Sequence, residues 1–437
     1  MSLRPFATAA CDERGTALPM AMLALLVLST LIIGFSVLAS SEPPIANNQL
    51  RVAQARAVAE AGVERAIWAL NRGISTPDDT NGIPVTFTTA PAPYNGSQLV
   101  SLGTGGNTIG GFRVTVTNGA TNYERNITAV GWVPNDTTTG PKTHQKITVT
   151  VFNPQWVMRD PPAALSVRGE LQMGGNSLVD SRQDTSCGRK MGTLTSGPTT
   201  LQGNATDIWG AETGTSDPNY SIRNQVVDAA NGAVPNSGGD VVQNVATSLP
   251  SGTPGLGFDS FVLSDADIDT LRSYAKAHGT YLQGTALFNA SNPLPNGLVF
   301  IDTVSGNNIT AEGVTPATQT SDFASVSIHG NAGTTGTDRA FNGWLFVNGT
   351  LSISGDFKMN GFAYAQNDIA YHGTGTGQLN GAMVSRNIRD QSSTSIDSDL
   401  LGNAAIVYNC QAAKTGGGSI AAKWNLKGGT YKEVSGS

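Results

Sequence analysis

The chain has 437 residues, enough for two or three domains. Glycine accounts for 52 of them and only 13% are charged, a composition typical of extracellular β-structure rich in turns and not of a cytosolic metabolic enzyme. The formal net charge is −6 and no run of Lys and Arg is present, which excludes a protein that holds nucleic acid along its whole surface and leaves only local basic loops.

Residues 16–41 contain no charged side chain and are long enough to cross a bilayer as a helix, which needs about 20 residues. They are too long for the apolar core of an ordinary secretory signal, which has roughly 7–15 residues. The small-residue break at Gly15 precedes the apolar run, so a cut there leaves the run on the mature chain. Two alternatives stay open: a secretory cleavage site at Val37-Leu38-Ala39, and an uncleaved membrane anchor.

The order of residues 1–15, MSLRPFATAACDERG, and the apolar run resembles the class III leader of type IV prepilins and pseudopilins. The resemblance implies that a prepilin peptidase cuts after Gly15 and methylates Thr16, with the leader in the cytoplasm. Most major pilins carry Glu at the fifth mature position, where it pairs with a neighbouring subunit's N-terminal amine; here Met20 stands there. In this respect the chain is similar to the large tip pseudopilin of type II secretion and to PilX-type minor pilins, which favours a tip or minor position.

Pro43 and Pro44 are expected to end or kink the spanning helix. Helical periodicity then resumes as far as Gly73, with its apolar positions on one face. The string ARAVAEAGVERAIWAL resembles the end of the N-terminal helix in the PilX N-terminal family, and the resemblance covers residues 14–72. The residues predicted on the apolar face are Val52, Ala55, Ala59, Val63, Ala66 and Leu70.

Residues 73–152 contain three segments in which apolar and polar side chains alternate, near 112–117, 125–132 and 147–151. Such alternation indicates an antiparallel sheet with one buried face. A long helix with an antiparallel sheet is the architecture that the pilin resemblance implies. The predicted fold class is therefore α+β for the N-terminal part, followed by a mainly-β domain over residues 153–437.

The mainly-β region is rich in short apolar pieces separated by Gly and Asn. Gly349, Gly355 and Gly361 lie at six-residue spacing, and similar pieces occur at 169–179 and 192–203. Strands this short are stable when stacked as successive rungs, which predicts an irregular parallel β-solenoid; the alternative is a β-sandwich with Gly-rich loops. Large PilX-like proteins show a similar order of motifs, and some minor pilins used in DNA uptake carry β-solenoids on a pilin stem.

A helix is predicted near 264–278, with Ser264 and Asp267 as its N-terminal capping pair. A last strand within 424–434 is expected to close the head domain.

Three cysteines are present, and Cys11 lies in the predicted leader. One remaining pair in an exported chain suggests a disulfide between Cys187 and Cys410; the alternative is two unrelated buried thiols.

Chemical motifs are weak throughout the chain. Asp265, Asp267 and Asp269 are similar to the start of a calcium loop but lack its Gly and final Glu. The glycines of 373–377 have no following Lys, so a turn is favoured over a phosphate loop. We therefore expect no metal, no cofactor and no enzymatic activity. The candidate carboxylate pair of a polysaccharide-active enzyme is Asp356 and Asp368. The scattered histidines are His144, His278, His329 and His372.

The function predicted on these grounds is that of a minor pilin-like structural subunit of a type IV pilus or related filament, at or near its tip. Its expected partners are other pilin subunits, the pilus assembly machinery, prepilin peptidase and the inner membrane, before transfer to the cell surface. Alternatives are an adhesin or a DNA-capturing head for natural transformation, and a membrane-anchored polysaccharide-active enzyme; the extracellular ligand is then a surface, a polysaccharide or DNA. The lysines that form either a basic patch or a solvated face are Lys414, Lys423, Lys427 and Lys432.

Overall fold

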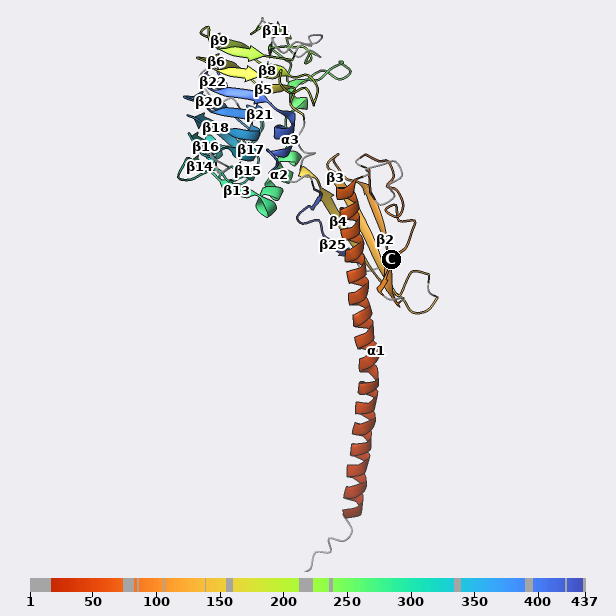
Figure 1. Cartoon of the computed structure of the whole chain (residues 1–437). Coiled ribbons are helices and arrows are strands. Elements are labelled where there is room, and N and C mark those ends of the chain that lie inside the picture. Colours follow the sequence, from red (N-terminus) through yellow and green to blue (C-terminus); the bar gives the residue numbers. More distant parts are fainter. Residues whose placement is uncertain are drawn as a thin grey trace, which may run out of the picture.

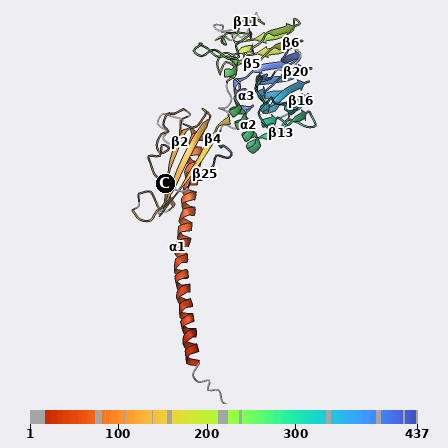
Figure 2. The same cartoon turned by 180° about the vertical axis from the view of Figure 1, so that it is seen from behind.

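The computed structural model consists of a long N-terminal helix, an antiparallel sheet on the upper part of that helix, and a large β-rich head (Figure 1). The view from behind shows the same three parts (Figure 2). The residues that the structure describes are 17–73, 82–84, 86–104, 107–137, 139–154, 160–211, 223–235, 239–333, 339–389, 396–420 and 423–434.

Helix α1 (Ala17–Arg72) continues through Pro43 and Pro44. Of the two expectations for these prolines, an end or a kink, the end of the helix was wrong. Each proline removes an N–H donor, at a cost of about 3 kcal/mol. Within the described ranges, α1 is the one helix long and apolar enough to cross a membrane.

The antiparallel sheet was predicted correctly, and strands β2, β3 and β4 cover the three alternating segments. The helix approaches the sheet closely because both surfaces carry small residues. A Cβ added at Gly131 of β3 would lie 2.2 Å from the carbonyl oxygen of Ala55 and 2.5 Å from the nitrogen of Ala59. The strands are β1 (Val100–Thr104), β2 (Asn107–Asn118), β3 (Glu124–Val133) and β4 (Thr143–Phe152).

The end of the chain returns to this sheet. Strands β24 (Asn425–Leu426) and β25 (Lys432–Val434) pair antiparallel with β4, so the expectation that the final strand closes the head was wrong. Trp424 explains the difference, because its side chain is buried in the core between α1 and the sheet. Its backbone N–H also donates to Asn71 Oδ1 of α1 at 2.6 Å. The head is thus inserted between two neighbouring strands of one sheet, β4 and β24.

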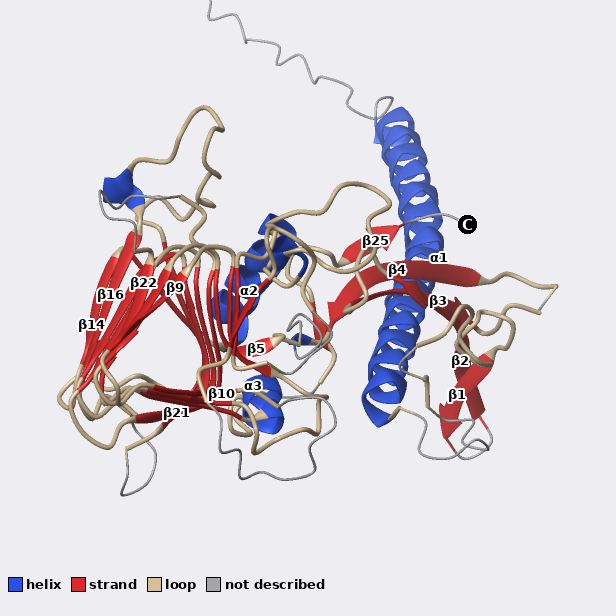
Figure 3. Ribbon diagram, turned by 90° about the horizontal axis from the view of Figure 1, so that it is seen from above, coloured by secondary structure: helices blue, strands red, loops and turns tan. Residues whose placement is uncertain are grey.

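The strands of the head pair in parallel, in two stacks whose members alternate along most of the chain; Figure 3 shows the stacks as separate walls. The first stack is β13 (Thr280–Gln283), β15 (Gly297–Asp302), β17 (Phe341–Val347), β19 (Met359–Ala365), β21 (Gln378–Ser385), β5 (Ala163–Val167), β8 (Met191–Thr195), β12 (Val241–Gln243) and β11 (Val226–Asp228). The second is β14 (Thr285–Phe288), β16 (Ala324–His329), β18 (Gly349–Ser354), β20 (Ile369–Gly373), β22 (Ser398–Gly402), β6 (Leu171–Gly174) and β9 (Thr199–Gln202). A short third column is β23 (Ala405–Tyr408), β7 (Leu178–Asp180) and β10 (Asp207–Trp209).

The order of strands in space differs from their order in the chain. The chain enters the head at β5–β7, which lie in the middle of the stacks, and then forms strands β8–β12 at one end of the stacks. A helix, residues 265–278, then leads to the opposite end, where β13 and β14 lie. The following strands continue from that end back toward the middle. The last strands, β21–β23, pair with the first, β5–β7. We call this junction the seam.

The unit that repeats along the first stack is an Asn-Gly pair, not the six-residue glycine spacing noted in the sequence. Gly343, Gly361 and Gly381 pair in register, 18 and 20 residues apart, and Gly297 pairs with Gly343. A side chain at these positions would strike the neighbouring strand, since a Cβ at Gly361 would lie 1.7 Å from the Gly343 carbonyl oxygen. A column of aromatic rings follows the same register: Tyr281, Phe300, Phe346 and Tyr364.

Two helices flank the stacks. Helix α2 (Asp265–His278) begins with the predicted capping box of Ser264 and Asp267, which confirms this helix and its N-cap. Helix α3 (Cys410–Thr415) follows β23 and has Asn409 as its N-cap. Short 3-10 turns lie at Phe258–Ser260 and Thr320–Asp322.

Candidate functional site

The first half of α1 is a continuous apolar surface with nothing packed on it. Every residue from 17 to 39 is exposed, including Leu25 at 67% and Phe35 at 66%. Burial of one such side chain contributes about 1.5–3 kcal/mol, so covering this segment with apolar surroundings would stabilise it. The upper half of α1 has its own partner, since Ala59 and Val63 belong to the core shared with the sheet.

The sheet and the head meet at a small contact that we call the neck. The hydroxyl of Tyr123, just before β3, donates to Asp267 in the first turn of α2. The ring of Phe152, at the end of β4, packs edge-on against Tyr274 with centroids 5.4 Å apart. Tyr123 and Phe152 are both buried in the head's hydrophobic core. Burial, together with the carboxylate of Asp267, raises the pKa of Tyr123, so its hydroxyl keeps its proton and remains a donor.

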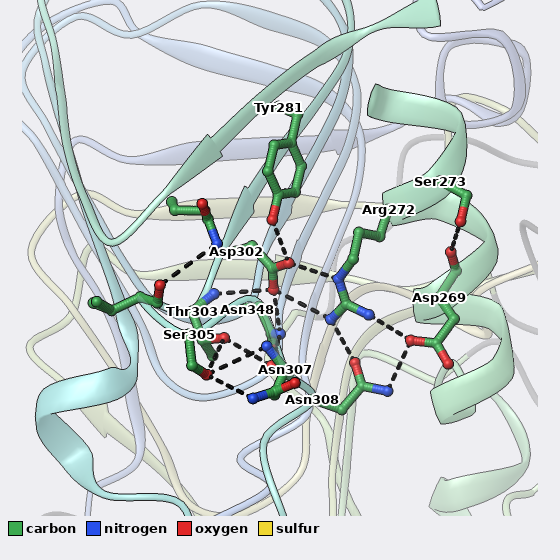
Figure 4. Close-up of polar contacts among 12 residues, drawn as sticks. Asp269, Arg272, Ser273, Tyr281, Asp302, Thr303, Ser305, Asn307, Asn308 and Asn348 are labelled. Carbon is green, nitrogen blue, oxygen red and sulfur yellow. Dashed lines mark hydrogen bonds and ion pairs between the residues drawn. The ribbon is translucent and has the colours of Figure 1, made fainter. Parts of the chain in front are cut away.

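The opposite side of α2 is fixed to the head by a buried carboxylate, Asp302, at the end of β15 (Figure 4). Its Oδ2 accepts from Arg272 Nε at 2.6 Å and from the Tyr281 hydroxyl at 2.9 Å. Its Oδ1 accepts from Asn348 Nδ2 at 2.8 Å and from the Thr303 N–H at 3.0 Å. These donors compensate the cost of burying a charge, so the network positions α2 against the head.

Arg272 lies at the centre of this network. Its side chain is 11% exposed and also contacts Asp269 and Asn308, the latter at 2.6 Å. Burial opposes its charge, but hydrogen bonds and attraction from Asp302 and Asp269 outweigh burial and raise the pKa of Arg272. For Tyr281, burial and the hydrogen bond to Asp302 raise the pKa to about 12.

The seam is held by covalent and polar links between residues 160–190 and 408–410. Cys187 and Cys410 form a disulfide with Cα atoms 5.8 Å apart. The N–H of Cys410 donates to Asp184 at 2.7 Å. Asp160 accepts from the Tyr408 hydroxyl at 3.1 Å and pairs with the ammonium of the buried Lys190 at 2.7 Å. Together these contacts join the first and last strands of the head.

The predicted processing residues, Gly15 and Thr16, lie outside the described residues. Met20 is on the exposed part of α1, 72% exposed. Asp368 lines a cavity of about 250 Å³ beside the second stack, whereas Asp356 is not among the residues lining that cavity. Lys427 pairs with Glu124 of the antiparallel sheet at 2.6 Å, while Lys414 belongs to α3 of the head, so the four lysines arise from different parts of the fold.

The histidines also lie apart. His329 contacts Ser354 at 2.7 Å and His372 contacts Asp399 at 3.0 Å, whereas His144 packs on Trp132 and His278 on Tyr274. Among the residues with described placements, no group of three or more His, Cys, Asp or Glu is arranged to hold a metal ion.

Sequence reasoning missed the Arg272–Asp302 pair, because the two residues are 30 positions apart and no local pattern links them. It also missed the repeated Asn-Gly pairs at 296–297, 342–343, 360–361 and 380–381. The last three pairs are visible in the sequence when segments about 20 residues apart are compared.

No family model matches the chain, so its resemblance to the PilX N-terminal family stays a prediction. No curated protein is similar to it at a significant level. Among solved structures, the crystal structure of the competence-associated pilin ComZ from Thermus thermophilus is similar, with 13% sequence identity over 88% of this chain and 97% of that chain, and a TM-score of 0.26. A TM-score this low establishes no shared fold by itself.

Proposed function

We propose that this chain is a minor pilin-like structural subunit of a type IV pilus or related filament. The observation that carries the proposal is the division of α1 into an exposed apolar half and a half packed on an antiparallel sheet. A helix of this kind is stable in a bilayer before assembly and between other apolar helices afterwards. The same surface then serves storage in the inner membrane and packing in a filament.

The finer parts of the proposal concern the two ends of the subunit. Met20 in place of a carboxylate supports a position at or near the tip, where no further subunit lies above whose N-terminal amine a carboxylate would pair with. The parallel pairing of the head strands supports its description as a β-solenoid. The PilX-like character, the cleavage after Gly15 and the methylation of Thr16 belong to this proposal too. No catalytic role is part of it.

A second candidate function, adhesion, is favoured by the outer face of the second stack. This face carries exposed hydroxyls such as those of Ser325 and Ser352, and it stands clear of α1 (Figures 1 and 2). A DNA-capturing head is less favoured, since one of the four candidate lysines, Lys427, is already paired with Glu124.

The proposal is tested by following the protein through fractionation of cells that produce filaments. We expect the full chain in the inner membrane and in sheared filaments. Changing Leu25 to Asp places a charge in the apolar half of α1 and is expected to deplete both pools, whereas the matched change of exposed Ser325 to Asp in the head leaves them unchanged. A wild-type chain recovered only as a free secreted protein would contradict the proposal.

A further inference from the structure

The repeated Asn-Gly pairs place a row of amide side chains along the first stack. Asn342, Asn360 and Asn380 occupy adjacent strands in register. Asn360 Nδ2 donates to Asn342 Oδ1 at 2.8 Å, and Asn380 Nδ2 donates to Asn360 Oδ1 at 3.0 Å. All three side chains are half-buried, so they reach solvent instead of the head's interior. The NH₂ groups of Asn360 and Asn380 each have a second N–H beyond these bonds, and the NH₂ group of Asn342 donates in neither of them.

Helix α3 and the glycines after it form a wall beside this row. The wall lies so close that a Cβ at Gly416 would be 2.8 Å from the Gly343 Cα, and one at Gly417 would be 2.8 Å from Asn342 Oδ1. Gly416 and Gly417 also have φ of 55° and 60°, which L side chains rarely adopt. The buried Trp344 fixes the wall by donating to the Ala413 carbonyl at 2.7 Å. The wall therefore has a defined position over the row.

Residues of the row and of the wall together line a cavity of about 490 Å³, which we call the amide groove. Its size is within the usual range of small-ligand sites, roughly 300–1,000 Å³. Its lining holds amides, one hydroxyl, Ala and Gly, and no charged or large apolar side chain. The residues that line it are Asn342, Asn360, Asn409, Gln411, Ala412, Thr415, Gly417 and Gly418.

The lining defines the chemistry of a ligand. A polyanion such as nucleic acid requires cations to neutralise its phosphates, and the groove offers none. An apolar ligand requires hydrophobic walls, which are also missing from the lining. Amides present donors and acceptors together, which matches the hydroxyls of an uncharged sugar. Gln411 is exposed at the rim, and its side-chain amide makes no hydrogen bond with the described part of the chain.

We propose that the amide groove binds an uncharged saccharide unit of an extracellular glycan. The inference rests on the proposed function, since the groove meets such a ligand only on a subunit displayed outside the cell. The amide row belongs to the first stack, and α3 packs against its strands β19 and β21. The site is therefore organised before the ligand arrives, which limits the entropy lost on binding.

The test uses the full-length protein in detergent micelles and an array of short neutral oligosaccharides of hexose and N-acetylhexosamine, with oligogalacturonate and single-stranded DNA as charged probes. We expect binding to a neutral oligosaccharide that is unchanged between low and high salt. Gln411→Ala, which removes one amide from the rim, is expected to weaken this binding about 3- to 10-fold, the value of one hydrogen bond. Asn360→Ala is expected to weaken it at least as much.

Gln283→Ala is the matched control, because it removes an exposed side-chain amide from β13, outside the groove. Thermal unfolding shows whether each variant keeps the fold. Absence of binding to every neutral oligosaccharide, preference for a charged probe, or equal binding by wild type and Gln411→Ala would overturn the inference. Filament association of the wild type is measured in parallel: filament association without binding to any neutral oligosaccharide rejects only the groove, while glycan binding without filament association rejects only the filament role.

Discussion

The hydroxyl of Tyr123 donates to the carboxylate of Asp267, 144 residues further along the chain, and so joins the antiparallel sheet to the first turn of α2. Asp267 also accepts from the N–H of Ser264 at 2.8 Å as part of the capping box. One carboxylate therefore caps the helix and holds the neck.

Replacing Tyr123 with Phe is expected to lower the free energy of unfolding by about 1.5–3 kcal/mol, because a buried hydrogen bond to a charged group is lost. Urea unfolding followed by tryptophan fluorescence measures the change. Tyr431→Phe is the matched control; this hydroxyl also contacts carboxylates, Glu60 and Glu433, but its side chain is 46% exposed. An equal decrease in the free energy of unfolding for the two variants would show that the neck hydrogen bond contributes no more than an exposed one.

Replacing Arg272 with Leu is expected to lower the free energy of unfolding by about 3–5 kcal/mol, since it leaves the carboxylate of Asp302 buried without its cation. Adding Asp302→Asn should restore part of the loss. The control is Arg223→Leu, which breaks an exposed pair with Asp207 and should cost about 0–1 kcal/mol. A double variant whose loss equals the sum of the single losses would argue against a coupled pair.

Tyr281 predicts a dependence of stability on alkaline pH. Its folded pKa of about 12 lies above the ordinary value of 10, so folding favours the protonated form. The contribution of Tyr281 to stability is therefore complete below pH 10 and is lost as the pH rises through about 12. Unfolding free energies across this range should fall more steeply for the wild type than for Tyr281→Phe, and identical slopes would contradict the prediction.

The disulfide is expected to stabilise the seam. Cys187 and Cys410 are 223 residues apart, and closing a loop of that length contributes about 5 kcal/mol in the chain-entropy description. A non-reducing peptide map should yield the linked peptides. Replacing both residues with Ser should lower the midpoint of urea unfolding as much as reductant does. Free alkylation of both cysteines without reductant would refute the bridge.

Processing of the leader is expected to yield a mature chain that begins at Thr16, with its amine methylated. Mass spectrometry of the filament-associated protein measures this. Gly15→Leu should block the cut and retain the protein in the membrane, while Ala17→Leu, beyond the cut, should permit it. A mature N-terminus near Ser40 would instead identify a secretory signal.

Local patterns in the sequence determined those helices and strands that depend only on residues close to one another along the chain. The apolar run of 16–41, the alternation at 112–117 and the Ser264–Asp267 cap each depend on neighbours along the chain, and α1, β2 and α2 formed where these patterns predict. The same patterns indicated short stacked strands in the head, because strands of four to seven residues need partners.

Only the tertiary structure decided which distant segments meet. The pairing of β24 with β4 and of β21 with β5 brings together residues more than 200 positions apart, so no local periodicity reports it. The helix-breaking tendency of Pro43 and Pro44 did not end α1, which continues to Arg72. The Arg272–Asp302 pair exists because α2 packs beside β15, and a buried charge is tolerated only where such packing supplies its donors.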